Sequence, residues 1–190
     1  MGLLINHSQK WAFIHIPKTG GNSISHILLN IPGTIQITTH GPLNQLQGVD
    51  GYFIFSFVRN PYTRLASWYE HIKRDTISQS FSNFIKSIDP LDFLFFSQEY
   101  YLNHGKTDIK KISYIGKYEN FNNDLYHIFG IIKVNTNTIP HLNRNRYWET
   151  HPTLNTYKLY KQYYKEQWMK DWVIEKYKND FKLFNYELDI

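Results

Sequence analysis

Residues Trp11–Ile24 constrain the fold of this chain most, because they join an apolar run, a glycine-containing loop and the start of a helical pattern. Trp11–Ile16 predicts a short strand, and Gly21–Asn30 carries apolar residues at helical spacing. A strand that turns through glycines into a helix N-terminus exposes backbone N–H groups and partial positive charge, to which Lys18 adds a full charge. The segment therefore predicts a site for a phosphate-bearing ligand.

Strand and helix patterns alternate over the first 75 residues. Thr34–Thr38 is β-branched, and Tyr52–Val58 is almost wholly apolar, as expected of a central parallel strand that is buried on both faces. Asn60 can cap a helix that begins at Pro61 and continues to about residue 74. This order predicts an α/β fold with a central, mostly parallel sheet flanked by helices.

The rest of the chain extends the same pattern. Ile112–Gly116 is expected to be another strand. Helices are expected at Phe81–Ile88, Leu91–Tyr101 and Asn120–Phe129, and helical periodicity continues from Thr153 to Asp180. Residues 135–152 are rich in polar residues and predict a long loop. With no repeat or linker, a single domain over residues 1–190 is expected.

Composition narrows the class of partner. The net charge of +5 suits an anionic ligand, but the basic residues are spread along the chain, so no nucleic-acid partner is predicted. The absence of cysteine excludes disulfides, thiolate metal sites and a cysteine nucleophile. No apolar run approaches the ~20 residues of a membrane span, and the N-terminal run is too short for a signal peptide, so a cytoplasmic protein is expected. The aromatic content of 17% favours a core built from rings.

The glycine loop differs from the P-loop of nucleotide-dependent kinases. In that motif the lysine follows the glycines, whereas Lys18 precedes Gly20 and Gly21. The strand at Tyr52–Val58 ends in Arg59 and carries no aspartate to hold Mg²⁺. Both features favour a site that neutralises phosphate with lysine and arginine, and no metal is predicted.

A second anion site is predicted after the strand at Tyr52–Val58. Arg59 stands at the carboxyl end of this strand, and Ser67 follows about two turns into the next helix. A guanidinium and a hydroxyl that converge on one point suit a second phosphate. Two such sites on neighbouring strand–helix turns predict a nucleotide with phosphates at two positions.

The sequence resembles sulfotransferases that use 3′-phosphoadenosine 5′-phosphosulfate (PAPS). Within this group it is similar to the carbohydrate-type branch, which includes heparan 2-O-sulfotransferase and bacterial relatives. Pro17–Ser23 matches the 5′-phosphosulfate loop of these enzymes, and Arg59–Ser67 matches their 3′-phosphate motif. Weaker matches follow in order at Ile115–Asn120, His141–Arg144 and Tyr177–Tyr186.

The resemblance implies a P-loop-like three-layer fold and transfer of a sulfuryl group from PAPS to a hydroxyl, which leaves 3′,5′-ADP. The acceptor it implies is a saccharide. Lys18 would stabilise the charge that develops on the leaving group, and Tyr118 would contact the adenine. The residues that it implies in cofactor binding are Pro17, Lys18, Thr19, Gly20, Gly21, Asn22, Ser23, Arg59, Ser67, Tyr118, Asn143 and Arg144.

The acceptor hydroxyl needs a base, and histidine has a suitable pKa. Of the nine histidines, His40 follows the second predicted strand at about the position of the general base in the carbohydrate-type branch. Glu70 is the alternative, because related enzymes use glutamate. Two other functions stay open: a nucleotide-dependent kinase, and a non-catalytic relative that binds adenosine bisphosphates or glycans.

Overall fold

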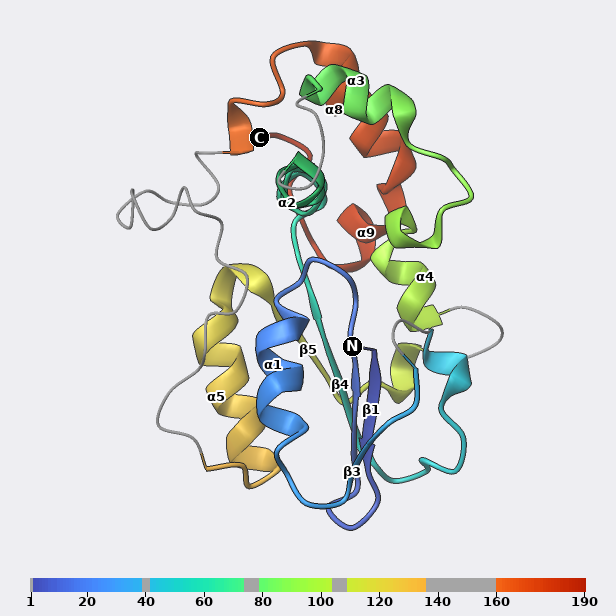
Figure 1. Ribbon diagram of the computed structural model, residues 1–190, viewed down its shortest axis with the longest axis vertical. Coiled ribbons are helices and arrows are strands. Elements are labelled where there is room, and N and C mark those ends of the chain that lie inside the picture. Colours follow the sequence, from blue (N-terminus) through green and yellow to red (C-terminus); the bar gives the residue numbers. More distant parts are fainter. Residues whose placement is uncertain (1, 39–41, 74–78, 104–108, 136–159) are drawn as a thin grey trace. The chain divides into compact units, whose positions relative to one another are not determined.

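The computed structural model describes residues 2–38, 42–73, 79–103, 109–135 and 160–190 (Figure 1). These residues belong to two compact units. The first unit comprises Met1–Arg59 and Gln98–Leu142, and the second comprises Asn60–Ser97 and Asn143–Ile190. The expectation of one domain over residues 1–190 stays a prediction.

The first unit is built on a mixed five-stranded sheet. Strands β2 and β4 pair in parallel, as do β4 and β5, whereas β1 is antiparallel to both β2 and β3. The mostly parallel sheet that the sequence predicted is therefore confirmed only for the half that contains β2, β4 and β5. In the order in which they lie across the sheet, the strands are β3 (Thr34–Gln36), β1 (Leu3–Asn6), β2 (Trp11–Ile14), β4 (Phe53–Val58) and β5 (Tyr114–Lys117).

Strand β1 is the element that changes the sheet from the predicted arrangement. It forms a hairpin with β2, in which Asn6 lies opposite Trp11. The side chain of Asn6 stabilises the turn by accepting hydrogen bonds from the Ser8 hydroxyl (2.8 Å) and the Gln9 amide (2.9 Å). Strand β3 pairs with β1 and not with β2, so its pairing in the sheet is antiparallel.

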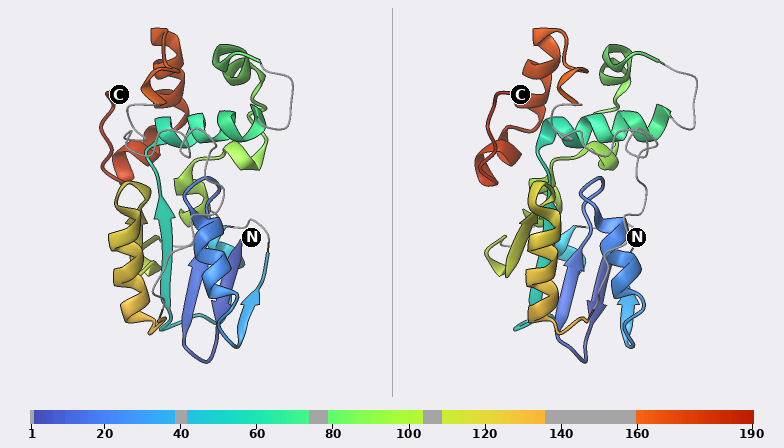
Figure 2. Two further views of the ribbon diagram at one scale, coloured as in Figure 1. Left: turned by 60° about the vertical axis from the view of Figure 1, so that its left-hand side comes forward. Right: turned by 90° about the vertical axis from the view of Figure 1, so that its left-hand side faces the viewer.

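Helices α1 (Gly21–Leu28) and α5 (Phe121–Ile131) pack on the same face of this sheet (Figures 1 and 2). Their buried side chains meet the aromatic residues that alternate along β2 and β4, including Phe13, Phe55 and Phe57. The strand residues between these aromatics are buried on the opposite face. Strands β2 and β4 are therefore buried on both faces, as predicted for the strand at Tyr52–Val58.

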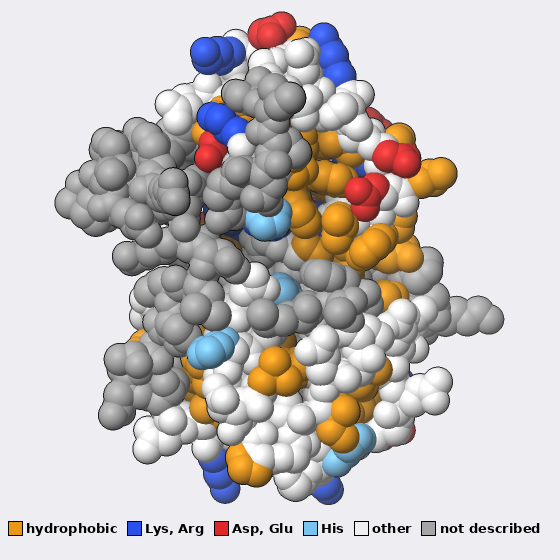
Figure 3. Space-filling view, viewed as in Figure 1, with side chains coloured by type: hydrophobic (Ala, Val, Ile, Leu, Met, Phe, Trp, Pro, Cys, Tyr) orange, Lys and Arg blue, Asp and Glu red, His pale blue; other side chains and the backbone are white. Residues whose placement is uncertain are grey.

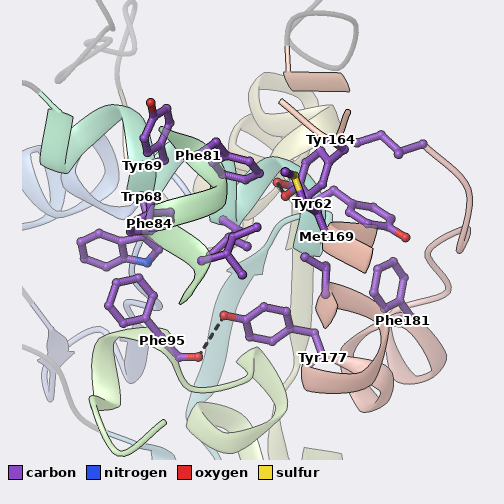
Figure 4. Close-up of a cluster of buried hydrophobic side chains, with 14 residues drawn as sticks. Tyr62, Trp68, Tyr69, Phe81, Phe84, Phe95, Tyr164, Met169, Tyr177 and Phe181 are labelled. Atoms are coloured by element: carbon purple, nitrogen blue, oxygen red, sulfur yellow. Dashed lines mark hydrogen bonds between the residues drawn. The ribbon is translucent and has the colours of Figure 1, made fainter. Parts of the chain in front are cut away.

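The second unit has a core made mainly of aromatic rings (Figure 4). Its elements are α2 (Pro61–Lys73), α3 (Phe81–Ser87), η2 (Phe93–Phe95), α8 (Gln167–Lys176) and α9 (Lys178–Leu183). Buried phenols satisfy their hydroxyls on backbone carbonyls: Tyr177 donates to Phe95 (3.0 Å), and Tyr164 donates to Tyr62 (2.7 Å). The high aromatic content thus serves the core, as the composition suggested.

Helix α2 begins as predicted, but the helix expected at Leu91–Tyr101 was wrong. The Asn60 side chain accepts a hydrogen bond from the amide of Tyr62 (3.0 Å), and Pro61 is the first helical residue. The segment after residue 91 contains only the single turn η2 and the short helix α4 (Gln98–Asn103). Asp92 caps the start of η2 by accepting a hydrogen bond from the Leu94 amide (3.0 Å), and the turn ends at Phe96, whose backbone is extended.

One face of the molecule shows how its described basic side chains are distributed. On the face drawn in Figure 3, the lysine and arginine side chains stand at separate places and form no continuous basic patch. Across the ranges that the structure describes, no helix is both long enough and apolar enough to cross a membrane.

We predict that Gly116→Ala destabilises the first unit. A methyl group on Gly116 would lie 2.6 Å from the buried ring of Phe57, so the sheet or the ring must shift at a cost of about 1–3 kcal/mol. Gly130→Ala is the matched control, because its methyl group meets no atom within 4 Å and removes a glycine from helix α5, with a gain of up to ~1 kcal/mol. Urea denaturation measures both, and equal stability of the two variants would contradict the packing argument.

Candidate active site

The loop that follows β2 is shaped by two residues with positive φ. Lys18 has φ +68° and Gly20 has φ +87°, so the chain reverses sharply before α1 begins at Gly21. The Thr19 hydroxyl, fully buried, donates to the carbonyl of Ile16 (2.9 Å) and fixes the turn from inside. In the described part of the chain, no side chain caps the N-terminus of α1. Its first amides are therefore suited to an anionic ligand.

Two aromatic rings explain why this loop contains adjacent glycines. A methyl group on Gly21 would lie 2.0 Å from the imidazole of His15, and one on Gly20 would lie 2.6 Å from the ring of Phe121. His15 is buried and stacks on Phe13, and Phe121 begins α5. The rings thus approach the loop backbone as closely as glycine allows, and they hold it against the end of the sheet.

Arg59 brings a second cation to this loop. It follows β4, is only 3% exposed, and donates from Nη1 to the carbonyl of Lys18 (3.2 Å). Its guanidinium carbon lies 4.0 Å from the centre of the Tyr118 ring. These two contacts are with neutral groups, which attract a guanidinium without cancelling its charge. The geometry can therefore accept an anion beside the glycine loop.

Two residues that the sequence did not identify hold this arrangement. Gln98, the first residue of α4, makes hydrogen bonds to both the amide and the carbonyl of Arg59. Asp124 of α5 accepts from the amide of Lys117 (2.7 Å) and from the Asn120 side chain (2.8 Å), on either side of Tyr118. No motif marks either residue, because each acts through a contact that only the folded chain creates.

Asp124 also changes the chemistry of a neighbouring phenol. The Tyr114 hydroxyl lies 3.2 Å from its carboxylate. Burial raises the pKa of Tyr114, and the negative charge of Asp124 raises it further. Tyr114 therefore stays a neutral donor to Asp124 near pH 7 and helps to fix the turn that carries Tyr118.

The structure brings together most of the predicted residues of the first unit, namely the loop Pro17–Ser23, Arg59 and Tyr118. Ser67 is half-buried in α2, within the second unit. His40, Asn143 and Arg144 lie outside the described residues. Among the residues that are described, no three His, Asp or Glu side chains are grouped as a metal site would require.

Glu70, the alternative base, has a partner in the second unit. The hydroxyl of Tyr163 donates a hydrogen bond to its Oε1. Burial raises the pKa of Tyr163, and the hydrogen bond and charge of Glu70 raise it further. The phenol therefore remains protonated as a donor, and one carboxylate oxygen of Glu70 is engaged by it.

These observations describe an α/β protein with a candidate anion site beyond the ends of its parallel strands β2, β4 and β5. Comparison with known proteins identifies the class further: residues 1–187 match the Sulfotransferase family. Since the match covers nearly the whole chain, the protein belongs to this family.

An individual relative matches over a shorter stretch. An uncharacterized protein from Archaeoglobus fulgidus is 36% identical over 78 residues. The matching stretch comprises 40% of this chain and 63% of the archaeal protein, so the chain covers less than two thirds of that relative. No solved structure matches the chain.

We predict that Gly21→Ala destabilises the protein by about 1–3 kcal/mol because its methyl group would overlap the His15 ring. In a His15→Ala background the same change should cost less, since the ring is gone. The coupling energy from the four proteins, measured by chemical denaturation, should reach about 1 kcal/mol or more. An equal cost in both backgrounds would show that His15 does not dictate the glycine.

Proposed function

We propose that this family member transfers a sulfuryl group from PAPS to a hydroxyl of a saccharide. The observation that carries the proposal is the buried Arg59 guanidinium, hydrogen-bonded to the carbonyl of Lys18 beside an uncapped helix N-terminus. Two cationic side chains and a set of backbone amides suit a ligand with two separate anionic groups. A 3′-phosphate and a 5′-phosphosulfate on one nucleoside meet that requirement.

The glycine loop supplies the 5′ side of the site. Gly20 and Gly21 allow the rings of Phe121 and His15 to pack closely against the loop backbone. The amides of Gly20–Ser23 bind the 5′-phosphate in this proposal, with Pro17 and Thr19 shaping the turn. Lys18 adds the full charge that a metal ion would supply in a kinase.

Arg59 supplies the 3′ side. A guanidinium can bind phosphate through two parallel N–H groups, which gives direction as well as charge. Ser67, Asn143 and Arg144 are assigned to cofactor binding by their match to the family motifs. Tyr118 contacts the adenine in addition to its contact with Arg59.

The chemistry follows from these roles. PAPS supplies the sulfuryl group, which passes to the acceptor oxygen as its bond to the 5′-phosphate oxygen breaks. Lys18 stabilises the negative charge that develops on that phosphate oxygen. His40 accepts the proton that the acceptor hydroxyl loses. The support for a saccharide acceptor is the resemblance of Pro17–Ser23 and Arg59–Ser67 to the carbohydrate-type branch.

We predict that the protein binds 3′,5′-ADP more tightly than 5′-AMP and that Arg59→Met removes most of this preference. Loss of a charge-assisted hydrogen bond to phosphate should lower the affinity ratio about 10- to 100-fold. Lys111→Met is the matched control, because it removes one positive charge from an exposed residue of the same unit. Isothermal titration calorimetry measures the affinity of each of the three proteins for both nucleotides.

The dependence of nucleotide binding on Mg²⁺ distinguishes the proposed function from a nucleotide-dependent kinase. Binding of 3′,5′-ADP should be the same with Mg²⁺ and with a chelator, since lysine and arginine neutralise the phosphates. A preference for ATP that requires Mg²⁺ would favour the kinase instead. Tight binding of 3′,5′-ADP without transfer to any hydroxyl would favour the non-catalytic relative.

We predict that His40→Ala keeps its affinity for 3′,5′-ADP but loses turnover by about 10²- to 10⁴-fold, as expected for removal of a general base. Release of 3′,5′-ADP from PAPS in the presence of a saccharide panel measures turnover. His127→Ala, an exposed residue of α5, is the control. Full activity of His40→Ala together with loss of activity in Glu70→Gln would assign the base to Glu70.

A further inference from the structure

Gln98 binds Arg59 at the backbone with both ends of its side-chain amide. Its Oε1 accepts from the Arg59 N–H (2.7 Å), and its Nε2 donates to the Arg59 carbonyl (2.8 Å). The side chain is fully buried, and both residues belong to the first unit. A buried amide with both of its polar atoms bonded to one residue fixes that residue strongly.

The position of these bonds relative to the sheet explains their effect. The parallel register pairs Ile14 of β2 with Ser56 and Lys117 of β5 with Val58, and it ends there. Arg59 is the next residue, beyond the last paired position of β4. Gln98 presents a donor and an acceptor to it, as a neighbouring strand would, and thus extends the ordered backbone by one residue.

The other end of Arg59 is held by different segments. Its guanidinium contacts the Tyr118 ring at 4.0 Å and the Lys18 carbonyl at 3.2 Å. The contacts at the guanidinium do not by themselves fix the φ and ψ angles of Arg59. With the backbone also fixed by Gln98, the long side chain is ordered before a ligand arrives, and less conformational entropy is lost on binding.

We propose that Gln98 is a positioning residue for recognition of the 3′-phosphate. It does not touch the ligand; it fixes the backbone from which Arg59 reaches the phosphate. This inference rests on the proposed function, because it takes Arg59 as the residue that binds the 3′-phosphate. It assigns to α4 a role in nucleotide discrimination that no motif in the sequence indicates.

The test separates positioning from a general structural role. Gln98→Met keeps a similar side-chain volume but removes both hydrogen bonds to Arg59. The ratio of the affinities for 3′,5′-ADP and 5′-AMP, measured by calorimetry, should fall about tenfold or more. The affinity for 5′-AMP should stay within about twofold of the wild type, since that ligand lacks the phosphate that Arg59 binds.

Gln36→Met is the matched control. Gln36 is exposed on β3 in the same unit, so this variant should keep the wild-type ratio. Circular dichroism of each variant shows that it is folded at the temperature of the titration. If the Gln98→Met protein is folded and its ratio is unchanged, or if both affinities fall equally, the positioning role is overturned.

Gln98→Glu provides a second variant, with a readout that a loss of packing would not produce. At neutral pH the introduced carboxylate accepts from the Arg59 amide but repels its carbonyl. Protonation below about pH 5 restores a donor. The affinity ratio, normalised to the wild type at each pH, should therefore be low at pH 7 and recover as the pH falls. A normalised ratio that is independent of pH would contradict the proposal even if Gln98→Met fails to fold.

The outcomes also separate this inference from the function on which it rests. A wild-type protein that does not prefer 3′,5′-ADP over 5′-AMP would overturn both. A wild-type preference that Arg59→Met reduces and the Gln98 variants keep would overturn only the role of Gln98.

Discussion

The parallel pairing of β2, β4 and β5 is the constraint on which the site depends. Parallel strands end at the same edge of a sheet, so the segments that follow them meet there. The Ser56 hydroxyl donates to the Ile14 carbonyl (2.8 Å) and helps to fix the register of β2 and β4. Lys18, Arg59 and Tyr118 each follow one of these strands. Residues about 40 or more positions apart in the sequence thereby become neighbours.

Burial of Arg59 gives this edge its chemical character. A guanidinium removed from water needs hydrogen-bond partners, and a buried charge usually needs an opposite charge. The Lys18 carbonyl and the Tyr118 ring satisfy part of the hydrogen-bonding and electrostatic demand without neutralising the charge. An anion bound beside Arg59, as proposed above, would add the opposite charge. The amides at the N-terminus of α1 and the side chain of Lys18 carry positive charge as well, so they would attract the same anion as Arg59 in the proposed site.

The sequence predicted the parts of the fold that rest on local patterns. The loop after β2, the buried strand β4 and the start of α2 follow from apolar periodicity, glycine and capping residues. Strand β1 was missed because four residues carry no clear periodicity, and its pairing with β2 depends on a turn fixed by Asn6. Gln98 could not be identified, since its bonds reach 39 positions along the chain.

The hydrogen bond from Arg59 to Lys18 couples the two sides of the site. Lys18 has a left-handed backbone conformation that costs free energy for a residue with a side chain, so the loop needs contacts that hold it. The bond from Arg59 is one of these contacts. Any group that restrains Arg59 also restrains the carbonyl of Lys18, and the reverse holds by thermodynamic linkage. When a ligand binds both Lys18 and Arg59, ordering one of these residues therefore lowers the conformational entropy that is lost in ordering the other.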